Sequence, residues 1–317
     1  MSIDYFTNRG STVFAAYLDC SKGFDKVNHD GIFLKLIQRR VPLCIVDLLI
    51  YWYSNLTSIV KWNSSYSFSF SVPSGVRQGG VLSPHLFAIY VDDLILALRK
   101  LNVGCHIIDL FLSCIVYADD ICLLAPSRSA LQLLLDTCEN YGIIWCLSYN
   151  PSKSRIMHFG KNVNRPTFTM YGNVLDYAND YKYLGVVIVA GKSFSVSQLN
   201  PLIKFRSAAN TVLNAQRLSS ENVLMMLLFS NCIPILTYAC EAVSYSTKQF
   251  QSLNVAVNDC IRRIFGYNRW ESVRYLRISM GYPSLTDVFY RLRENFLKNI
   301  PLIGNPTLKA LDKFLSS

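Results

Sequence analysis

Three aspartates stand where apolar strands are expected to end, and together they could hold a divalent cation. Asp19 follows Thr12–Leu18 (TVFAAYL), an apolar run typical of a buried strand that delivers a carboxylate at its C-terminal end. Asp119 and Asp120 interrupt Leu110–Pro126, a stretch otherwise without charge, where two acids are costly unless they have a role. Clustered carboxylates repel one another unless a hard cation neutralises them, so the pattern predicts a Mg²⁺ site. Two such ions about 4 Å apart can activate a 3′-hydroxyl and stabilise departing pyrophosphate.

A second Asp-Asp pair, in Tyr90-Val91-Asp92-Asp93, resembles the first in sequence but lies in a different context. The surrounding apolar residues recur at helical spacing, which predicts a helix whose apolar face excludes these two acids. We therefore expect Asp92 and Asp93 to be merely solvated and assign the chemistry to Asp119 and Asp120. The residues of the predicted apolar face are Leu86, Ile89, Tyr90, Leu94, Ala97 and Leu98.

The order of elements predicts an α+β fold that brings Asp19 beside the other two acids. Cys114–Ala125 is apolar on both sides of Asp119-Asp120 and suits a strand–turn–strand hairpin. Two antiparallel strands at the centre of one sheet would place both sites together despite their separation in sequence. Further strands are expected at Arg155–Phe159, Phe168–Tyr171 and Tyr181–Val189, and helices from Asp30 to before Pro42, at Val41–Tyr53, Ser83–Leu98 and Ser129–Tyr141.

Local patterns between the first and second acidic sites predict a hairpin and a capped helix. Thr57–Trp62 and Tyr66–Val72 flank Asn63-Ser64-Ser65, and the second run alternates apolar residues with serine, as a half-buried strand does. Ser83-Pro84 predicts an N-cap followed by proline at the first helical position. Trp52 and Trp62 are expected in the core rather than as platforms for stacked bases.

Charge restricts the class of partner. The chain has a net charge of +10 over 317 residues, which points to a polyanion such as nucleic acid or an acidic membrane surface. Residues 1–194 carry 17 basic and 14 acidic side chains, whereas residues 195–317 carry 14 and 7. The excess therefore lies in a C-terminal helical part, which would suit binding of phosphates; a solvated basic face is the alternative. Gly191–Ser195 is the expected boundary.

Cysteines and hydropathy favour an intracellular protein with reduced thiols. The ten cysteines include no C-x-x-C pair and no zinc-type spacing with the four histidines. Asn222–Cys240 is uncharged and nearly as long as a membrane span, but Pro234 interrupts it, so we expect a buried broken helix and no membrane contact. Neither a nuclear nor a cytoplasmic location is favoured, since no dense basic run is present.

Five segments in order resemble motifs A to E of the reverse transcriptases of non-LTR, LINE-type retrotransposons. The resemblance covers most of residues 12–265 and implies a right-hand polymerase: a palm in residues 1–192, with a ferredoxin-like antiparallel sheet and packed helices, and a helical, basic thumb or connection region in residues 193–317. The segments are Ala16–His29 (AYLDCSKGFDKVNH), Ser74–Leu94 (SGVRQGGVLSPHLFAIYVDDL), Val116–Leu123 (VYADDICL), Tyr141–Gly160 and Tyr181–Val187 (YKYLGVV), followed by Ile235–Ser244, which resembles a segment after the polymerase.

The resemblance assigns roles to the acidic residues and their neighbours. Asp19, Asp119 and Asp120 match the metal-binding carboxylates for two Mg²⁺ ions, with Mn²⁺ as an alternative, and Cys20 would lend its backbone carbonyl. Phe24 matches the aromatic steric gate, whose ring would collide with a ribose 2′-hydroxyl. Two motif A residues are expected to be structural: Asp25, through hydrogen bonds within motif A, and His29, as a helix-start residue.

Further roles fall on the other motifs. Gln78 and Gly79 match the loop that touches the incoming nucleotide and template. Arg77 is either a phosphate contact or a fork to a carboxylate, and Lys153 either protonates the leaving pyrophosphate or is a surface lysine. The primer grip would comprise Tyr183, Leu184 and Gly185.

The implied function is RNA-directed DNA polymerisation, the transfer of dNTPs to the 3′-end of a DNA primer on template RNA. Only about a dozen residues precede Thr12, so a fingers region and an endonuclease are expected elsewhere, in a longer polyprotein from which this chain is truncated. That leaves open whether the chain is active alone. The alternatives are RNA-dependent RNA synthesis and a non-catalytic remnant that binds nucleic acid through its basic C-terminal part.

Overall fold

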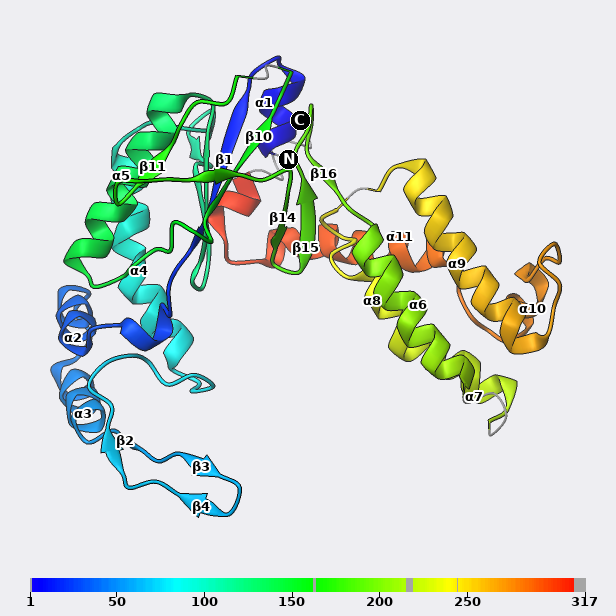
Figure 1. Ribbon diagram of the computed structural model, residues 1–317, viewed down its shortest axis with the longest axis horizontal. Coiled ribbons are helices and arrows are strands. Elements are labelled where there is room, and N and C mark those ends of the chain that lie inside the picture. Colours follow the sequence, from blue (N-terminus) through cyan, green and yellow to red (C-terminus); the bar gives the residue numbers. More distant parts are fainter. Residues whose placement is uncertain (1, 162–163, 215–218, 244, 311–317) are drawn as a thin grey trace. The chain divides into compact units, whose positions relative to one another are not determined.

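The computed structural model describes residues 2–161, 164–214, 219–243 and 245–310, and the chain forms two compact units (Figure 1). The first unit contains the chain up to Asn179 together with residues 190–194. The second contains residues 180–189 and the chain from Ser195 onward. Each unit has its own hydrophobic core.

A five-stranded sheet forms the centre of the first unit, in the order β13-β10-β1-β9-β8. All neighbours are antiparallel except β13, which runs parallel to β10. The central strand β1 is buried on both faces up to Leu18, as its uninterrupted apolar sequence requires. The strands are β1 (Val13–Asp19), β8 (Cys114–Tyr117), β9 (Asp120–Ala125), β10 (Arg155–Phe159) and β13 (Asp176–Tyr177).

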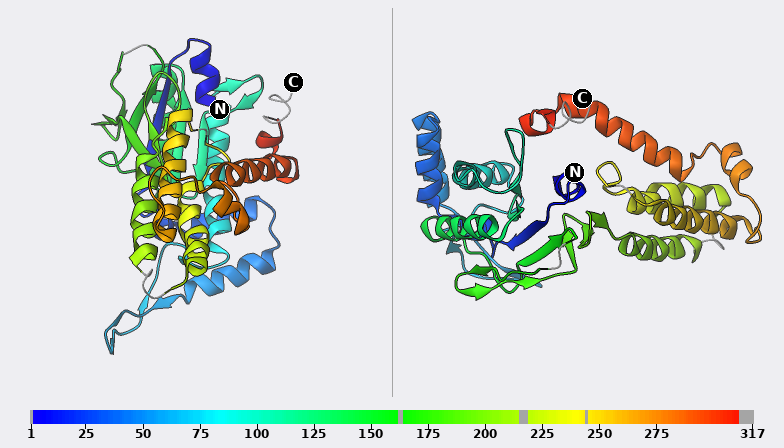
Figure 2. Two further views of the ribbon diagram at one scale, coloured as in Figure 1. Left: turned by 90° about the vertical axis from the view of Figure 1, so that its right-hand side faces the viewer. Right: turned by 90° about the horizontal axis from the view of Figure 1, so that it is seen from above.

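Three helices that follow the acidic or glycine-rich segments contribute to the core of the first unit (Figure 2). They are α2 (His29–Gln38), α4 (Ser83–Lys100) and α5 (Arg128–Ile144). Their limits lie within two residues of the predicted ones, except that α2 ends three residues early and α5 ends three residues late. The expected faces are confirmed, since Leu86, Tyr90, Leu94 and Leu98 of α4 are buried. The side chain of Ser127 caps α5 by accepting from the amide of Ala130.

The Thr57–Val72 region forms the predicted hairpin, but its tryptophan is not in a core. Strand β2 (Thr57–Ser58) pairs with β5 (Phe70–Ser71), and β3 (Lys61–Trp62) pairs with β4 (Ser65–Tyr66). Trp62 is 78% exposed and Trp52 is 52% exposed, so the core prediction is wrong for both. The hairpin has no second layer among the described residues, which leaves both faces of its strands exposed.

The start of α4 also differs from the prediction. Ser83 is the first helical residue rather than the N-cap, a position taken by Leu82. The hydroxyl of Ser83 instead donates to the carbonyl of Arg77 and so closes the preceding loop. The remaining elements of the first unit are α1 (Ser2–Asn8), η1 (Phe24–Lys26), α3 (Leu43–Ser54), β6 (His106–Ile107), β7 (Leu110–Phe111), β11 (Thr169–Met170) and β12 (Asn173–Val174).

The second unit combines a three-stranded sheet with a helical core. Helix α9 begins with a capping box between Ser246 and Gln249 and is followed by the C-cap Gly266, which has a φ of +67°. The strands are β14 (Asp180–Tyr183), β15 (Val186–Val189) and β16 (Ser195–Val196). The helices are α6 (Leu199–Asn214), α7 (Glu221–Leu227), α8 (Ile233–Thr237), α9 (Thr247–Phe265), α10 (Arg274–Ser279), α11 (Leu285–Asn299) and η4 (Ile300–Leu302).

The uncharged segment Asn222–Cys240 is largely helical and contributes buried residues to the second core. A π-helical turn, Leu228–Cys232, separates α7 from α8 directly before Pro234, which fits the lost amide donor of proline. Within the described residues no helix has the length and apolarity needed to span a membrane. All ten cysteines lie in the described part of the chain and carry free thiols.

The expected boundary and the compact units differ at one hairpin. The prediction assigned residues 180–189 to the first domain, whereas they pack with the second unit. The reason is local, because the hydroxyl of Tyr238 donates to the carbonyl of Leu184 at 2.9 Å. The functional division at residue 192 stays a prediction.

Candidate active site

Asp19 and Asp120 are direct register partners on the antiparallel strands β1 and β9. Asp19 is the last residue of its strand and Asp120 the first of the other, so both carboxylates lie at the same edge of the sheet. Cα atoms in such pairs are about 4.5–5.5 Å apart. Both side chains are half-buried, which leaves them accessible to a ligand.

Asp119 lies in the tight turn between β8 and β9, next to a strained residue. Ala118 has a φ of +53°, a conformation that costs energy for a residue with a Cβ. The segment after β1 approaches this turn closely, since a Cβ added to Gly23 would lie 3.2 Å from the Cβ of Asp119. The fold therefore brings Asp119 to the same edge as the other two acids.

The electrostatics of the three carboxylates reflect their proximity. Burial first, and then the charges of Asp119 and Asp19, raise the pKa of the Asp120 carboxyl. Burial and the same two charges raise the pKa of the Cys20 thiol to about 12. In the part of the chain that the structure describes, no three or more His, Cys, Asp or Glu side chains are gathered into a metal-binding group. The three carboxylates lie at the same edge of the sheet, but they do not converge as ligands of a single ion.

A turn from the predicted motif D segment holds Asp19 in place. The amide of Asn150 donates to the carbonyl of Asp19 at 2.8 Å, and the amide of Asp19 donates to the hydroxyl of Ser154 at 3.2 Å. Lys153 belongs to the same turn, and its exposed side chain has no ion pair with a described residue. Ser154 was missed by sequence reasoning, because an isolated serine gives no signal of a partner 135 residues away.

The ring of Phe24 is stacked on Phe87 of α4. Their ring centroids are 4.5 Å apart and their planes differ by 9°. The backbone on either side is held by the glycine-rich loop, since the amide of Val76 donates to the carbonyl of Phe24 at 2.7 Å. Phe87 was not singled out in the sequence, where it is one of many apolar residues on this helix.

The glycine-rich loop also meets motif A through its side chains. The Gln78 amide donates to the carboxylate of Asp25 at 3.0 Å, so the Asp25 side chain bonds to this loop. Within motif A, as expected, Asp25 also forms a hydrogen bond, through its backbone amide to the carbonyl of Lys22 at 3.0 Å. A Cβ on Gly75 would lie 2.7 Å from the carbonyl oxygen of Asp25, which leaves room only for glycine. His29 starts α2 as predicted, and its Nε2 is 2.8 Å from the Gly75 carbonyl oxygen.

Arg77 and Gly79 face solvent beside a hollow of about 500 Å³. The Arg77 guanidinium has no carboxylate within ion-pair distance among the described residues, so it is not the structural fork considered above. Gly79 has a φ of +80° and open space around it, which lets a ligand approach the backbone. Trp52 lines the same hollow.

The residues expected to form the primer grip build a tight hairpin turn in the second unit. Leu184 and Gly185 have φ angles of +46° and +82° between the paired residues Tyr183 and Val186. The Tyr238 ring closes over the turn, 3.0 Å from where a Cβ on Gly185 would lie. The segment Tyr181–Val189, expected as a strand, thus forms two strands joined by this turn, while its role as a primer grip stays a prediction.

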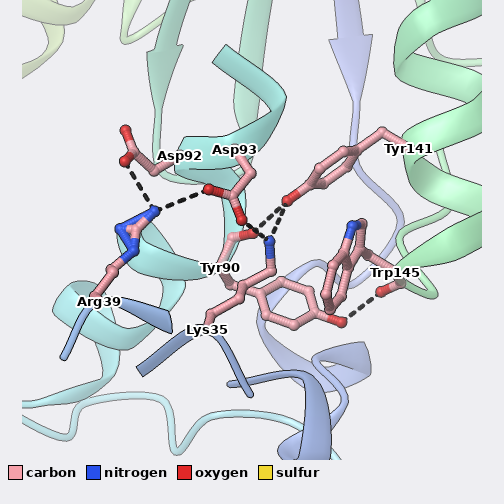
Figure 3. A network of polar contacts seen from close by, with 7 residues as sticks. All are labelled: Lys35, Arg39, Tyr90, Asp92, Asp93, Tyr141 and Trp145. Atoms are coloured by element: carbon pink, nitrogen blue, oxygen red, sulfur yellow. Dashed lines mark hydrogen bonds and ion pairs between the residues drawn. The ribbon is translucent and has the colours of Figure 1, made fainter. Parts of the chain in front are cut away.

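The second Asp-Asp pair is not merely solvated, and that expectation is wrong (Figure 3). Asp93 of α4 forms an ion pair with Lys35 of α2, whose side chain has no solvent exposure. Arg39, the C-cap residue of α2, bridges both acids, at 2.9 Å from Asp92 and 3.1 Å from Asp93. The two positive charges of Lys35 and Arg39 therefore balance the negative charges of the two aspartates.

Aromatic residues complete the surroundings of Lys35. Its ammonium donates to the Tyr141 hydroxyl at 2.9 Å and lies 3.8 Å from the centre of the Trp145 ring. The Tyr90 hydroxyl donates to the carbonyl of Trp145, and the Tyr141 hydroxyl donates to that of Tyr90. These contacts join α2, α4 and α5, so Asp92 and Asp93 have a structural role.

A family model described as reverse transcriptase (RNA-dependent DNA polymerase) matches residues 3–188, more than half of the chain. The chain belongs to the reverse transcriptase family. Its relatives among curated proteins come from non-LTR retrotransposons, so it is a LINE-type member. The RNA-directed DNA polymerase from mobile element jockey of Drosophila funebris is 25% identical over 94% of this chain.

The chain is also similar to a further curated protein and to a solved structure. The Pol polyprotein from type-2 retrotransposable element R2DM of Drosophila melanogaster is 31% identical over 44% of this reverse transcriptase chain and 13% of its own length. Apo telomerase from Candida tropicalis aligns over 93% of this chain and 54% of its own, with 13% identity and a TM-score of 0.48. The chain spans about a third of the length of the jockey relatives, 33% in each case.

Proposed function

We propose that the chain carries the polymerase centre of a non-LTR retrotransposon reverse transcriptase, with residues 1–192 as palm and residues 193–317 as thumb or connection region. The register pair of Asp19 and Asp120, with Asp119 in the adjoining turn, is the observation that carries this proposal. The implied reaction is the addition of dNTPs to the 3′-end of a DNA primer on template RNA. Two jockey relatives are named RNA-directed DNA polymerases.

The donor chemistry of the three acids fits Mg²⁺. Oxygen ligands suit this ion, and the raised pKa of Asp120, caused by burial and by the neighbouring charges, marks a repulsion that a cation would relieve. Asp19, Asp119 and Asp120, with the carbonyl of Cys20, would hold two ions after side-chain rotation. When bound, the ions supply activation of the 3′-hydroxyl and neutralise charge on the departing pyrophosphate.

The chain's other residues would position the reactants. Phe24, with Phe87 stacked against one face of its ring, would exclude a ribose 2′-hydroxyl by steric collision. Lys153, on the turn that binds Asp19, would donate a proton to the leaving pyrophosphate. Arg77 would contact the triphosphate, since its guanidinium is not engaged by a described carboxylate.

The nucleic acid would be held by two further features. Gln78 and the open backbone at Gly79 would touch the nascent base pair, and the turn at Tyr183, Leu184 and Gly185 would hold the primer end. A non-catalytic remnant that binds nucleic acid is the second candidate, favoured by the excess of basic over acidic residues, 14 to 7, in residues 195–317.

Primer extension separates the two candidates. The chain, alone and joined to the preceding polymerase region of a jockey relative, would be given a DNA primer on an RNA template with dNTPs and Mg²⁺. Extension that requires Mg²⁺ and follows the template supports the polymerase. Salt-dependent binding of primer–template with no incorporation by either protein would support the remnant instead.

A further inference from the structure

A hollow of about 460 Å³ in the second unit is lined by four arginines. It lies between α6 and α9, which pack side by side (Figures 1 and 2). No residue of the proposed polymerase centre lines it. The lining residues that matter here, termed the arginine hollow, are Arg206, Asn210, Arg262, Arg263, Tyr267 and Arg269.

Helix periodicity explains why these side chains meet. On α6, Arg206 and Asn210 are one turn apart and follow directly after the buried Phe205 and Ala209, so they flank the apolar face. The C-terminal part of α9 supplies Arg263, whose guanidinium donates to the Asn210 side-chain oxygen at 3.0 Å. This contact joins the polar borders of the two helices at the hollow.

The charges in the hollow are not balanced by acids. Asp259 is the acidic residue lining it, and its carboxylate is already paired with Arg262 at 2.7 Å. Neither Arg206 nor Arg269 forms an ion pair with any residue that the structure describes. The positive charge that remains is therefore available to a ligand.

Two arginines of the hollow act electrostatically on one thiol that lines it. Burial raises the pKa of the Cys260 thiol to about 11, and the charges of Arg263 and Arg206 act against that rise. Both groups must therefore lie within electrostatic range of the same sulfur atom. Two guanidinium groups repel each other at short range, and an anion bound between them would offset this repulsion.

The helix dipole accounts for only part of the cluster. Arg262 and Arg263 occupy the last turn of α9, where cations are stabilised by the C-terminal carbonyls. That explanation does not extend to Arg206, in the middle of α6, or to Arg269, beyond the end of α9.

We propose that the arginine hollow binds the phosphodiester backbone of a nucleic-acid strand. Guanidinium groups bind phosphate oxygens through paired N–H donors, and the half-exposed ring of Tyr267 offers a stacking surface for an adjacent base. The hollow is a second nucleic-acid contact, separate from the polymerase centre. It depends on the proposed function only in that the chain's substrate is nucleic acid.

The test uses fluorescence anisotropy of labelled oligothymidylate over a range of NaCl concentrations. The double variant Arg206→Gln/Arg269→Gln removes the two arginines that make no ion pair with described residues and should leave the fold intact. The salt slope should fall by about 1.4, since each lost phosphate contact on a single strand contributes about 0.7, and affinity at low salt should fall roughly tenfold. Arg291→Gln is the matched control, an exposed arginine of α11 outside the hollow, and should change neither.

Competitors identify the class of anion. Inorganic phosphate should displace the strand from the parent protein weakly and with the same dependence on Arg206 and Arg269. An equal loss of affinity in the control variant, or no loss in the double variant, would overturn the proposal. So would preferential binding of polyglutamate over oligothymidylate, which would mark an acidic protein as the partner.

The two proposals fail separately. If strand binding depends on Arg206 and Arg269 but no dNTP is incorporated, the hollow is supported and the polymerase function is not. If Mg²⁺-dependent extension occurs and the double variant binds primer–template as the parent does, the polymerase stands and the hollow does not.

Discussion

The buried Lys35 forms an ion pair with the partly exposed Asp93, and this pair joins α2 to α4. The sequence context had predicted that Asp93 was only solvated. The ammonium of Lys35 has no exposure to solvent, whereas the carboxylate of Asp93 is 37% exposed. Burial acts to lower the pKa of Lys35, and the hydrogen bond and charge of Asp93 oppose that change. The pair therefore keeps a charged lysine in the core.

Removal of one partner of the Lys35–Asp93 pair should lower the free energy of unfolding more than removal of both. Asp93→Asn leaves the Lys35 ammonium buried without its counter-charge, and the free energy of unfolding should fall by about 2 kcal/mol, a value reduced for the exposure of Asp93. The double variant Lys35→Met/Asp93→Asn should recover at least half of this loss. Urea unfolding measures both.

Asp92→Asn is the control for that cycle. Asp92 pairs with Arg39 at 2.9 Å and its side chain is 49% exposed, so its loss should cost less than about 0.5 kcal/mol. Equal losses in Asp92→Asn and Asp93→Asn would contradict the structural role of the inner pair.

The same pair predicts a pH dependence. Burial acts to raise the pKa of Asp93, but the hydrogen bonds and charges of Lys35 and Arg39 outweigh it, and the folded-state pKa lies below 3.8. As the pH falls, the unfolded chain takes up this proton first, so the stabilisation is complete above the unfolded pKa and is lost as the pH falls through the folded one. Urea midpoints from pH about 6 to about 2 should therefore fall less steeply in Asp93→Asn. An identical acid slope in both proteins would contradict the prediction.

Gly185 should tolerate alanine less well than a second glycine of similar backbone conformation. Both Gly185 and Gly281 have positive φ angles, +82° and +75°, so alanine is strained at each by roughly 1 kcal/mol. Only at Gly185 would the new Cβ meet the Tyr238 ring, at 3.0 Å, whereas Gly281 has open space. Thermal unfolding should show a loss about twice as large for Gly185→Ala; equal losses would mean that the ring simply moves away.

Much of the site could be predicted because its signals are local. The apolar run before Asp19 and the uncharged surround of Asp119 and Asp120 identify two strand ends, and β1 and β9 do pair at those residues. The partners of the helical acids could not be predicted, since nothing in the sequence around Asp93 indicates Lys35, which lies on another helix.

The solvent exposure of Trp62 was also predicted wrongly. Trp62 is large and apolar, and composition favours a core position, but its hairpin has no layer to pack against among the described residues. Phe87 shows the opposite case, because a residue that looks like ordinary core turns out to fix the ring of Phe24.

Substitution of Phe24 tests the steric gate. Phe24→Ala removes the ring that stacks on Phe87, so a 2′-hydroxyl would no longer collide with it. In a protein that extends a primer, the ratio of kcat/KM for dNTP to that for the matching ribonucleotide should fall by a factor of at least about 10. An unchanged ratio with normal dNTP use would remove Phe24 from the nucleotide site.

The most direct test of the polymerase centre compares the two Asp-Asp pairs in one assay. Mg²⁺-dependent dNTP incorporation on an RNA template would be measured for the parent, Asp119→Asn and Asp92→Asn, with folding checked by circular dichroism. The register of Asp19 with Asp120 and the placement of Asp119 beside them predict that Asp119→Asn abolishes incorporation, by a factor of at least about 1000. Asp92→Asn should retain most of it. Undiminished incorporation by a folded Asp119→Asn protein would contradict the account.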